Sequence, residues 1–187
     1  MNDYEKPPAQ RPEHPDFWCK RFGEGTTPWD AGKVPDDFAA FIAHQTTPQH
    51  TLIPGCGSAW EAVHLANANW PVTALDFSPM AVERAREVLA GHPVDLVCAD
   101  FFDFAPSRPY TLIYERAFLC ALPRKLWADW GRRVAELLPP GGLLAGLLGA
   151  ILQRLLLGDR GWVRAWEQHA TVIVWLVIAF ELLFALY

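Results

Sequence analysis

The sequence predicts an α/β fold, a three-layer sandwich in which helices cover both faces of a mostly parallel sheet. Two observations predict it. Short apolar runs that suit buried strands alternate with longer amphipathic runs that suit helices. The chain of 187 residues is also 51% hydrophobic and 20% charged, which is typical of one globular domain with a substantial core. The strands that we expect span residues 51–53, 71–76, 94–100, 110–115 and 143–148.

Helices are expected before the first strand and between the later ones. The clearest end signals belong to the helix at 78–91, where Ser78 can cap the first turn, Pro79 suits it, and Gly91 suits the end. The content of glycine and proline makes 23–35 and 101–109 loops. The helices that we expect span residues 16–22, 36–44, 59–68, 78–91 and 125–138.

The two ends of the chain differ from this domain, which we place at residues 16–148. Residues 1–15 carry four prolines among polar residues and are expected to form a flexible arm. Residues 149–187 form an atypical hydrophobic segment, and its last part, 171–187, is mostly apolar and slightly shorter than the roughly 20 residues that span a bilayer. Three interpretations stay open for it: a buried strand pair or core helix, a membrane anchor, or a tail of altered coding that packs poorly.

Charge and cysteine spacing exclude several classes of protein. A formal net charge of −5 without a basic stripe argues against nucleic acid as a partner. The four cysteines form no Cys-x-x-Cys pair, and their wide spacing fits neither a metal site nor a small disulfide framework. We therefore expect no bound metal, and reduced thiols in a cytoplasmic protein.

The turn after the first expected strand is the first candidate for a ligand site. Gly55 and Gly57 lack a Cβ, so the backbone can turn sharply and a ligand can approach it closely. Asp76 ends the second expected strand and can accept hydrogen bonds from both hydroxyls of a ribose. Both features lie at the carboxyl ends of parallel strands, where open α/β sheets bind their ligands.

The third strand end adds a carboxylate and an aromatic ring. Asp100 can accept a hydrogen bond from an adenine amine, and Phe101 can lie against the adenine ring. The turn is not a dinucleotide fingerprint, because Trp60 stands where the third glycine would be, and no Gly-Lys-Ser/Thr follows as in a P-loop. The combination favours a nucleoside without a pyrophosphate, namely S-adenosylmethionine.

Six stretches of the chain carry a resemblance to a known family: FWCKRFGEGTTPWD, LIPGCGSAWEAVHLA, VTALDFSPMAVERAR, ADFFDF, YERAFLCALP and LLPPGGLLAG. Over about residues 16–148 the chain resembles the bacterial branch of the thiopurine S-methyltransferase family. The resemblance implies a class I methyltransferase fold, which is Rossmann-like, and S-adenosylmethionine as the cofactor. It also implies methyl transfer to a small soft nucleophile, most often a thiol.

The resemblance also implies which residues contact the cofactor, and it places Arg116 between cofactor and acceptor as the catalytic residue. For each aromatic residue the alternative is core packing, and for Arg116 it is an ion pair with Glu115 or Asp100. The expected cofactor contacts are Trp18, Phe22, Trp29, Gly55, Cys56, Gly57, Asp76, Phe77, Asp100, Phe101 and Arg116.

The expected mechanism needs neither a metal nor a dedicated general base, since the sulfonium methyl is already an electrophile. The protein has to hold a thiolate in line with it and exclude water, and Arg116 can stabilise that thiolate. We expect a monomer that acts on a small-molecule thiol. Two alternatives depend on the C-terminal segment: a cofactor-binding remnant with impaired catalysis, or a membrane-tethered methyltransferase of a lipophilic acceptor.

Overall fold

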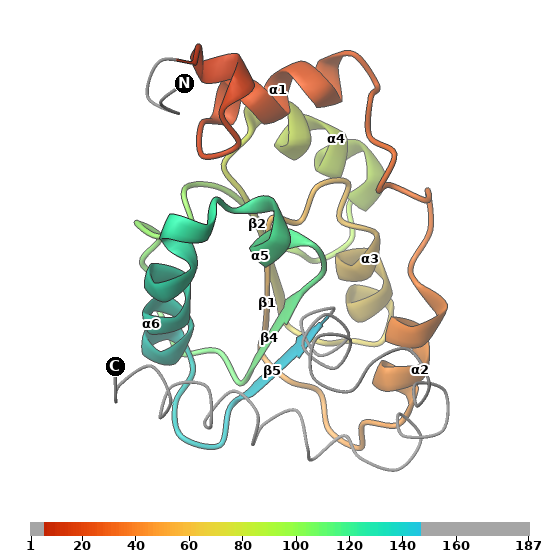
Figure 1. The fold of residues 1–187 in the computed structure, drawn as a ribbon. Helices are drawn as coiled ribbons and strands as arrows, with labels where there is room; N and C mark the ends of the chain where they lie inside the picture. Colours follow the sequence, from red (N-terminus) through yellow and green to blue (C-terminus); the bar gives the residue numbers. More distant parts are fainter. Residues whose placement is uncertain (1–5, 147–187) are drawn as a thin grey trace, which may run out of the picture.

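A computed structural model of the chain describes residues 6–146 (Figure 1). The interpretations of the C-terminal segment at 149–187, and the last residues of the strand expected at 143–148, lie outside the described residues. Within 6–146, no helix combines the length and the apolar character that a membrane crossing requires.

Five parallel strands form one sheet in the order β3-β2-β1-β4-β5. The order reverses between β1 and β4, so the carboxyl end of β1 lies at the point where open α/β sheets bind ligands. Every strand expected from the sequence is present, which confirms the parallel sheet. The strands are β1 Thr51–Pro54, β2 Val72–Asp76, β3 Asp95–Cys98, β4 Leu112–Glu115 and β5 Leu143–Gly146.

The five expected helices are also present, and three short ones add to them. The Ser78 hydroxyl caps α4 by accepting a hydrogen bond from the amide of Ala81 at 3.3 Å, as expected. The α-helices are α1 Pro15–Gly23, α2 Asp36–Ala43, α3 Trp60–Asn67, α4 Pro79–Leu89, α5 Phe118–Ala121 and α6 Trp127–Leu137. The 3₁₀ helices are η2 Pro8–Gln10 and η3 Arg124–Leu126.

Helices cover both faces of the sheet, which confirms the three-layer sandwich (Figure 1). One core joins β1 to α2, α3 and α4, and Phe38, Ile53 and Leu65 belong to it. The other joins β1 to α5 and α6, and Leu52 and Trp130 belong to it. Leu52 and Ile53 are neighbours in β1 but pack in different cores, because successive side chains of a strand point to opposite faces of the sheet.

Residues 6–15, which the sequence predicts to be part of a flexible arm, make defined contacts. The indole of Trp18 donates to the carbonyl of Pro12 at 2.7 Å, and Lys125 pairs with Glu13 at 2.9 Å. Burial raises the pKa of Glu13, but hydrogen bonds from Lys125 and from Arg11 outweigh it, and the pKa falls to about 2. A carboxylate this acidic stays charged at neutral pH and ties the arm to η3.

Replacement of Leu52 by alanine tests the placement of β1 in the core. Leu52 is fully buried, so we expect Leu52→Ala to lower the free energy of unfolding by about 2–5 kcal/mol, measured by urea denaturation of the full chain. Met80, which is 43% exposed on α4, serves as the control, and Met80→Ala should change that free energy by less than about 1 kcal/mol. Equal losses in the two variants would contradict this placement.

Candidate functional site

The turn between β1 and α3 passes repeatedly through left-handed backbone conformation. Gly55 has a φ of 60°, Gly57 of 53° and Ala59 of 61°. Alanine rarely adopts such a φ, and Ala117, at the end of β4, repeats the feature with a φ of 68°. Backbone strain of this kind, of order 1–3 kcal/mol per residue, tends to gather at functional sites. Within residues 6–146, two of the four non-glycine residues with positive φ lie at the carboxyl ends of the adjacent strands β1 and β4, and the other two, Asn69 and Ala90, follow helices α3 and α4.

Asp76 closes this turn from the end of β2. Its Oδ2 accepts a hydrogen bond from the amide of Gly57 at 3.0 Å, and its Oδ1 accepts one from the amide of Ser78 at 2.9 Å. The residue is 8% exposed, and burial raises the pKa of Asp76 although these amides oppose the rise. Each carboxylate oxygen has a second lone pair. The group can therefore still accept hydrogen bonds from a ligand at the turn.

The aromatic residues expected to contact the cofactor lie together beside the turn. Trp29 packs edge-on against Trp18, with ring centroids 5.7 Å apart, and against Phe22 at 6.2 Å. A Cβ placed on Gly57 would lie 3.5 Å from the Phe22 ring, so this cluster reaches the turn itself. Trp29 is 40% exposed and can contact a ligand. The structure thus joins helix α1 and the loop after it to the glycine turn.

Asp30, the residue after Trp29, binds that loop to the turn, and sequence reasoning did not single it out. Its carboxylate accepts hydrogen bonds from the hydroxyl of Ser58 and from the indole Nε1 of Trp60, the latter at 3.0 Å. The amide of Gly32 also donates to it, at 2.9 Å. The sequence offers two signals for this residue: an aspartate two positions before a glycine in a loop, which is typical of a turn, and its place at the end of the stretch FWCKRFGEGTTPWD. The partners near residue 60 could not be found that way.

The end of β3 places Asp100 at the same edge of the sheet but Phe101 in the core. The Asp100 Oδ1 accepts from the amide of Phe102 at 2.9 Å. Phe101 is only 3% exposed and packs edge-on against Phe118 with centroids 5.3 Å apart. Phe77, at the end of β2, is partly exposed. A contact between Phe101 and an adenine stays a prediction, and core packing accounts for the ring in this structure.

Arg116 pairs with a residue that the sequence did not suggest. Its Nη1 lies 3.8 Å from Oε1 of Glu61, in the first turn of α3, and within residues 6–146 it makes no ion pair with Asp100. Burial raises the pKa of Glu61, and the charge of Arg116 opposes the rise. The neighbouring Glu115 is buried and accepts from the amide of Leu119 at 3.0 Å. The long distance to Glu61 and a side-chain exposure of 39% leave the guanidinium of Arg116 accessible.

Cys56, at the centre of the turn, is buried, and burial raises the pKa of its thiol well above the ordinary value. A thiol in this state is a poor nucleophile. Among residues 6–146, no group of three or more His, Cys, Asp or Glu side chains is arranged to hold a metal ion.

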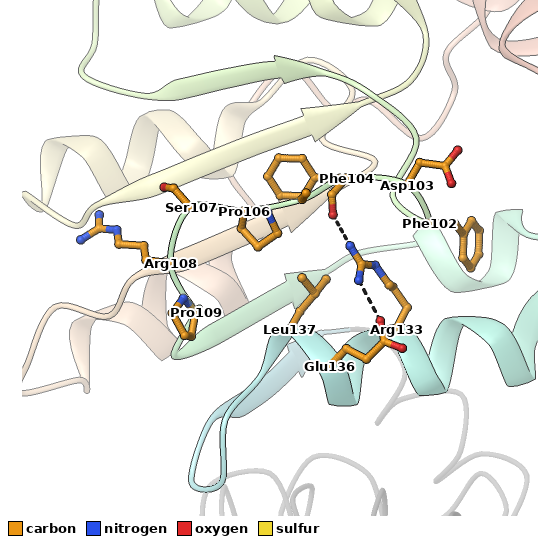
Figure 2. A pocket seen from close by; sticks show the side chains of 11 residues that line it. Phe102, Asp103, Phe104, Pro106, Ser107, Arg108, Pro109, Arg133, Glu136 and Leu137 are labelled. Carbon is orange, nitrogen blue, oxygen red and sulfur yellow. Dashed lines mark hydrogen bonds and ion pairs between the residues drawn. The ribbon is translucent and has the colours of Figure 1, made fainter.

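Two surface cavities lie away from the turn. One of about 600 Å³ is lined by residues 102–109 and by Arg133, Glu136 and Leu137 of α6 (Figure 2). The other, of about 470 Å³, lies at the amino ends of β2 and β3 and shares residues 104–108 with the first. Because both are at a distance from the strand ends that carry the strained backbone, we place the candidate site at the turn.

Arg133 crosses the first cavity and braces the loop after β3 (Figure 2). Its guanidinium donates to the carbonyl of Phe101 at 3.2 Å and to the carbonyl of Phe104. Glu136, on the same helix, pairs with it at 2.8 Å. Helix α6 therefore holds in place the segment that begins with Asp100.

A comparison with protein-family models places this site in a known family. The model of thiopurine S-methyltransferase matches residues 13–153. The chain belongs to the thiopurine S-methyltransferase family. The match includes the glycine turn, Asp76, the aromatic cluster and Arg116, and the predicted membership is confirmed.

Curated relatives come from plants and from bacteria. A probable thiol methyltransferase 2 of Arabidopsis thaliana is 33% identical over 142 residues, which are 73% of this chain and 63% of the relative. Thiocyanate methyltransferase 1 of Brassica oleracea is 31% identical over 70% of this chain and 60% of its own. A thiopurine S-methyltransferase of Vibrio cholerae is 31% identical over half of each chain. This chain thus spans about three fifths of the length of its plant relatives.

Solved structures show the same fold. The CcbJ methyltransferase from Streptomyces caelestis is 29% identical with a TM-score of 0.53, over 62% of this chain and 49% of that one. A structure of DhpI is 20% identical with a TM-score of 0.53, over 70% of this chain and 64% of that one. The predicted class I methyltransferase fold of this family member is confirmed.

Gly55 and Gly25 offer a matched test of the turn. Both have a positive φ, but a Cβ on Gly55 would lie 2.5 Å from Cδ2 of Phe118, whereas one on Gly25 would meet no atom within 4 Å. Gly25→Ala should therefore cost only the backbone strain, about 1 kcal/mol of unfolding free energy. Gly55→Ala should cost at least twice as much, because Phe118 has to move. Equal costs in urea denaturation would refute this account of the turn.

Proposed function

We propose that the chain is an S-adenosylmethionine-dependent methyltransferase that transfers a methyl group to the sulfur of a small thiol or to another soft nucleophile. One observation carries the proposal: the buried carboxylate of Asp76 lies against a strained glycine turn, in a chain of this family. The backbone amides of Gly57, Ser78 and Phe77 orient this carboxylate and do not use all of its four lone-pair sites. It is suited to the ribose hydroxyls of an adenosyl group.

The residues around the turn fit the other parts of such a cofactor. The partly exposed ring of Trp29, with Trp18 and Phe22 behind it, offers an apolar surface beside the turn. Asp100, at the end of β3, can accept a hydrogen bond from an adenine amine. Cys56, Gly57 and Phe77 complete the expected contacts through their place at the same strand ends.

The bound cofactor supplies an electrophilic methyl group on a sulfonium. The chain's own part is to hold the acceptor in line and to favour its anionic form. Arg116 is placed for the second task, because its accessible guanidinium at the end of β4 lowers the pKa of a thiol that binds beside it. Glu61 pairs with this guanidinium at 3.8 Å and so limits the directions in which it can point.

The nature of the acceptor is supported by the family. The names of the relatives include thiol, thiocyanate and thiopurine methyltransferases, and each name refers to a sulfur-containing compound. The bacterial branch stays a prediction, since plant and bacterial relatives have similar identities to this chain. A monomeric state and a cytoplasmic location also stay predictions.

Asp76→Ala tests the position of the cofactor. A hydrogen bond to a charged group contributes about 1.5–3 kcal/mol, so the affinity for S-adenosylmethionine should fall roughly tenfold or more, measured by titration calorimetry. Asp95→Ala is the matched control, because Asp95 is exposed at the opposite end of the sheet and should leave the affinity unchanged. The assignment fails if Asp76→Ala binds the cofactor as well as the wild-type chain does.

Arg116→Ala tests the activation of the acceptor. Without the positive charge the bound thiol keeps a higher pKa, so methylation of a simple thiol should slow at neutral pH and its pH-rate profile should move to higher pH. Arg116→Lys should recover part of the rate. Arg132→Ala, which removes an exposed arginine of α6, is the control. An unchanged rate, profile and cofactor affinity in Arg116→Ala would remove this residue from the mechanism.

A further inference from the structure

We propose that Asp30 is a positioning residue of the cofactor site: it anchors the Trp29 loop to the glycine turn and so controls cofactor affinity. The inference rests on the proposed function, because the cofactor is S-adenosylmethionine. Asp30 itself has no expected contact with the cofactor. It acts through Trp29, its neighbour in the chain, whose ring is 40% exposed beside the turn.

Asp30 joins two segments that are about thirty residues apart in the sequence. Its Oδ2 accepts a hydrogen bond from the hydroxyl of Ser58, which lies within the turn. Its Oδ1 accepts from Nε1 of Trp60 at 3.0 Å, and from the amide of Gly32 at 2.9 Å. Both carboxylate oxygens thus accept hydrogen bonds. Oδ2 is bonded to the turn, and Oδ1 is bonded both to the first residue of α3 and to the loop. Such an arrangement restrains the rotation of the carboxylate as well as its distance from the turn.

The same contact explains the tryptophan at position 60. Dinucleotide-binding turns carry a third glycine there, which lets the helix approach the strand. In this chain the indole of Trp60 extends from the start of α3 and donates to Asp30, so the bulky side chain joins the turn to the Trp29 loop. Where dinucleotide-binding turns have a small glycine that allows close packing, this turn has the large Trp60, whose indole holds the Trp29 loop through Asp30.

Asp30 remains an anion in this setting. Burial raises its pKa, but the hydrogen bonds from Ser58, Gly32 and Trp60, together with the charge of Arg84, outweigh burial and lower it. Hydrogen bonds to a charged acceptor are stronger than those between neutral groups, and loss of the acceptor leaves its donors unpaired. Removal of this single carboxylate should therefore release the loop.

The test compares Asp30→Ala, Asp30→Asn and the control Asp36→Asn, whose parent carboxylate makes an exposed ion pair with Lys33. We expect Asp30→Ala to weaken S-adenosylmethionine binding roughly tenfold in calorimetry, a loss typical of hydrogen bonds to a charged group. Asp30→Asn keeps an acceptor oxygen and should recover part of the affinity. Asp36→Asn should bind as the wild-type chain does. Equal affinity in all chains would overturn the proposal.

A double-mutant cycle separates positioning from general stability. If Asp30 acts through Trp29, then Asp30→Ala should have little further effect on binding in a chain that already carries Trp29→Ala. Additive losses would show that Asp30 affects binding by another route and would refute the proposal. Trp60→Phe removes one donor and keeps an aromatic ring, so it should reproduce part of the loss.

Hydrogen exchange without any ligand distinguishes this proposal from the proposed function. In Asp30→Ala the amide of residue 30, which donates to the carbonyl of Thr27, and the amide of Gly32 should exchange faster than in the wild-type chain, while those of β1 and β2 should be unchanged. If exchange is faster in Asp30→Ala but the wild-type chain does not bind S-adenosylmethionine, the proposed function is refuted. Asp30 would then anchor the loop without any role in cofactor affinity. Unchanged exchange at the amide of residue 30 would refute the anchor itself, whatever the wild-type chain binds.

Discussion

The turn from Gly55 to Ala59 is the constraint on which the rest of the site depends. Its backbone enters left-handed conformation at Gly55, Gly57 and Ala59, and such a path needs support from outside. The support comes from β2, which pairs with β1, and from α5, the helix that follows β4. The amide of Cys56 donates to the carbonyl of Leu75 on β2 at 3.0 Å, and the ring of Phe118 on α5 fills the space that a side chain on Gly55 would occupy. The sheet, the helix after β4 and the N-terminal loop therefore meet at this one turn.

Three carboxylates around the turn are kept in different electrostatic states by their surroundings. Burial raises the pKa of Asp76 and of Glu61, and hydrogen bonds to backbone amides or the charge of Arg116 compensate in part. Asp30 is less buried and accepts three hydrogen bonds, so its pKa is lowered. Asp76 is buried with lone pairs still open to a hydrogen-bond donor, whereas Glu61 already has Arg116 as a positively charged partner at 3.8 Å. Asp30 already has its partners, which suits an anchor rather than a ligand contact.

Local pattern predicted the sheet, the main helices and the position of Asp76 at the end of β2, because strand ends, caps and glycines leave their signal within a few residues. The four-residue helix α5 was missed, since one turn is too short to show a periodicity. The pairs Asp30–Trp60 and Glu61–Arg116 were also missed, because each joins residues that only the folded chain brings together. Gly55 was assigned to a sharp turn and to close approach of a ligand. Its φ of 60° fits the turn, the ring of Phe118 takes the position of its missing Cβ, and the ligand contact stays a prediction. A glycine in a sequence shows that space is needed but not what fills it.

Two side chains outside the strands, those of Arg133 and Asp30, hold the loop after β3 and the Trp29 loop in place. On one face of the sheet, Arg133 of α6 holds the carbonyls of Phe101 and Phe104, and so the segment that starts at Asp100. On the other side, Asp30 holds the Trp29 loop to the turn. A parallel sheet positions only the ends of its strands, and the loops that follow are free to move unless side chains restrain them. The order of this site therefore depends on residues outside the strands, because Arg133 and Asp30 each restrain one of its loops.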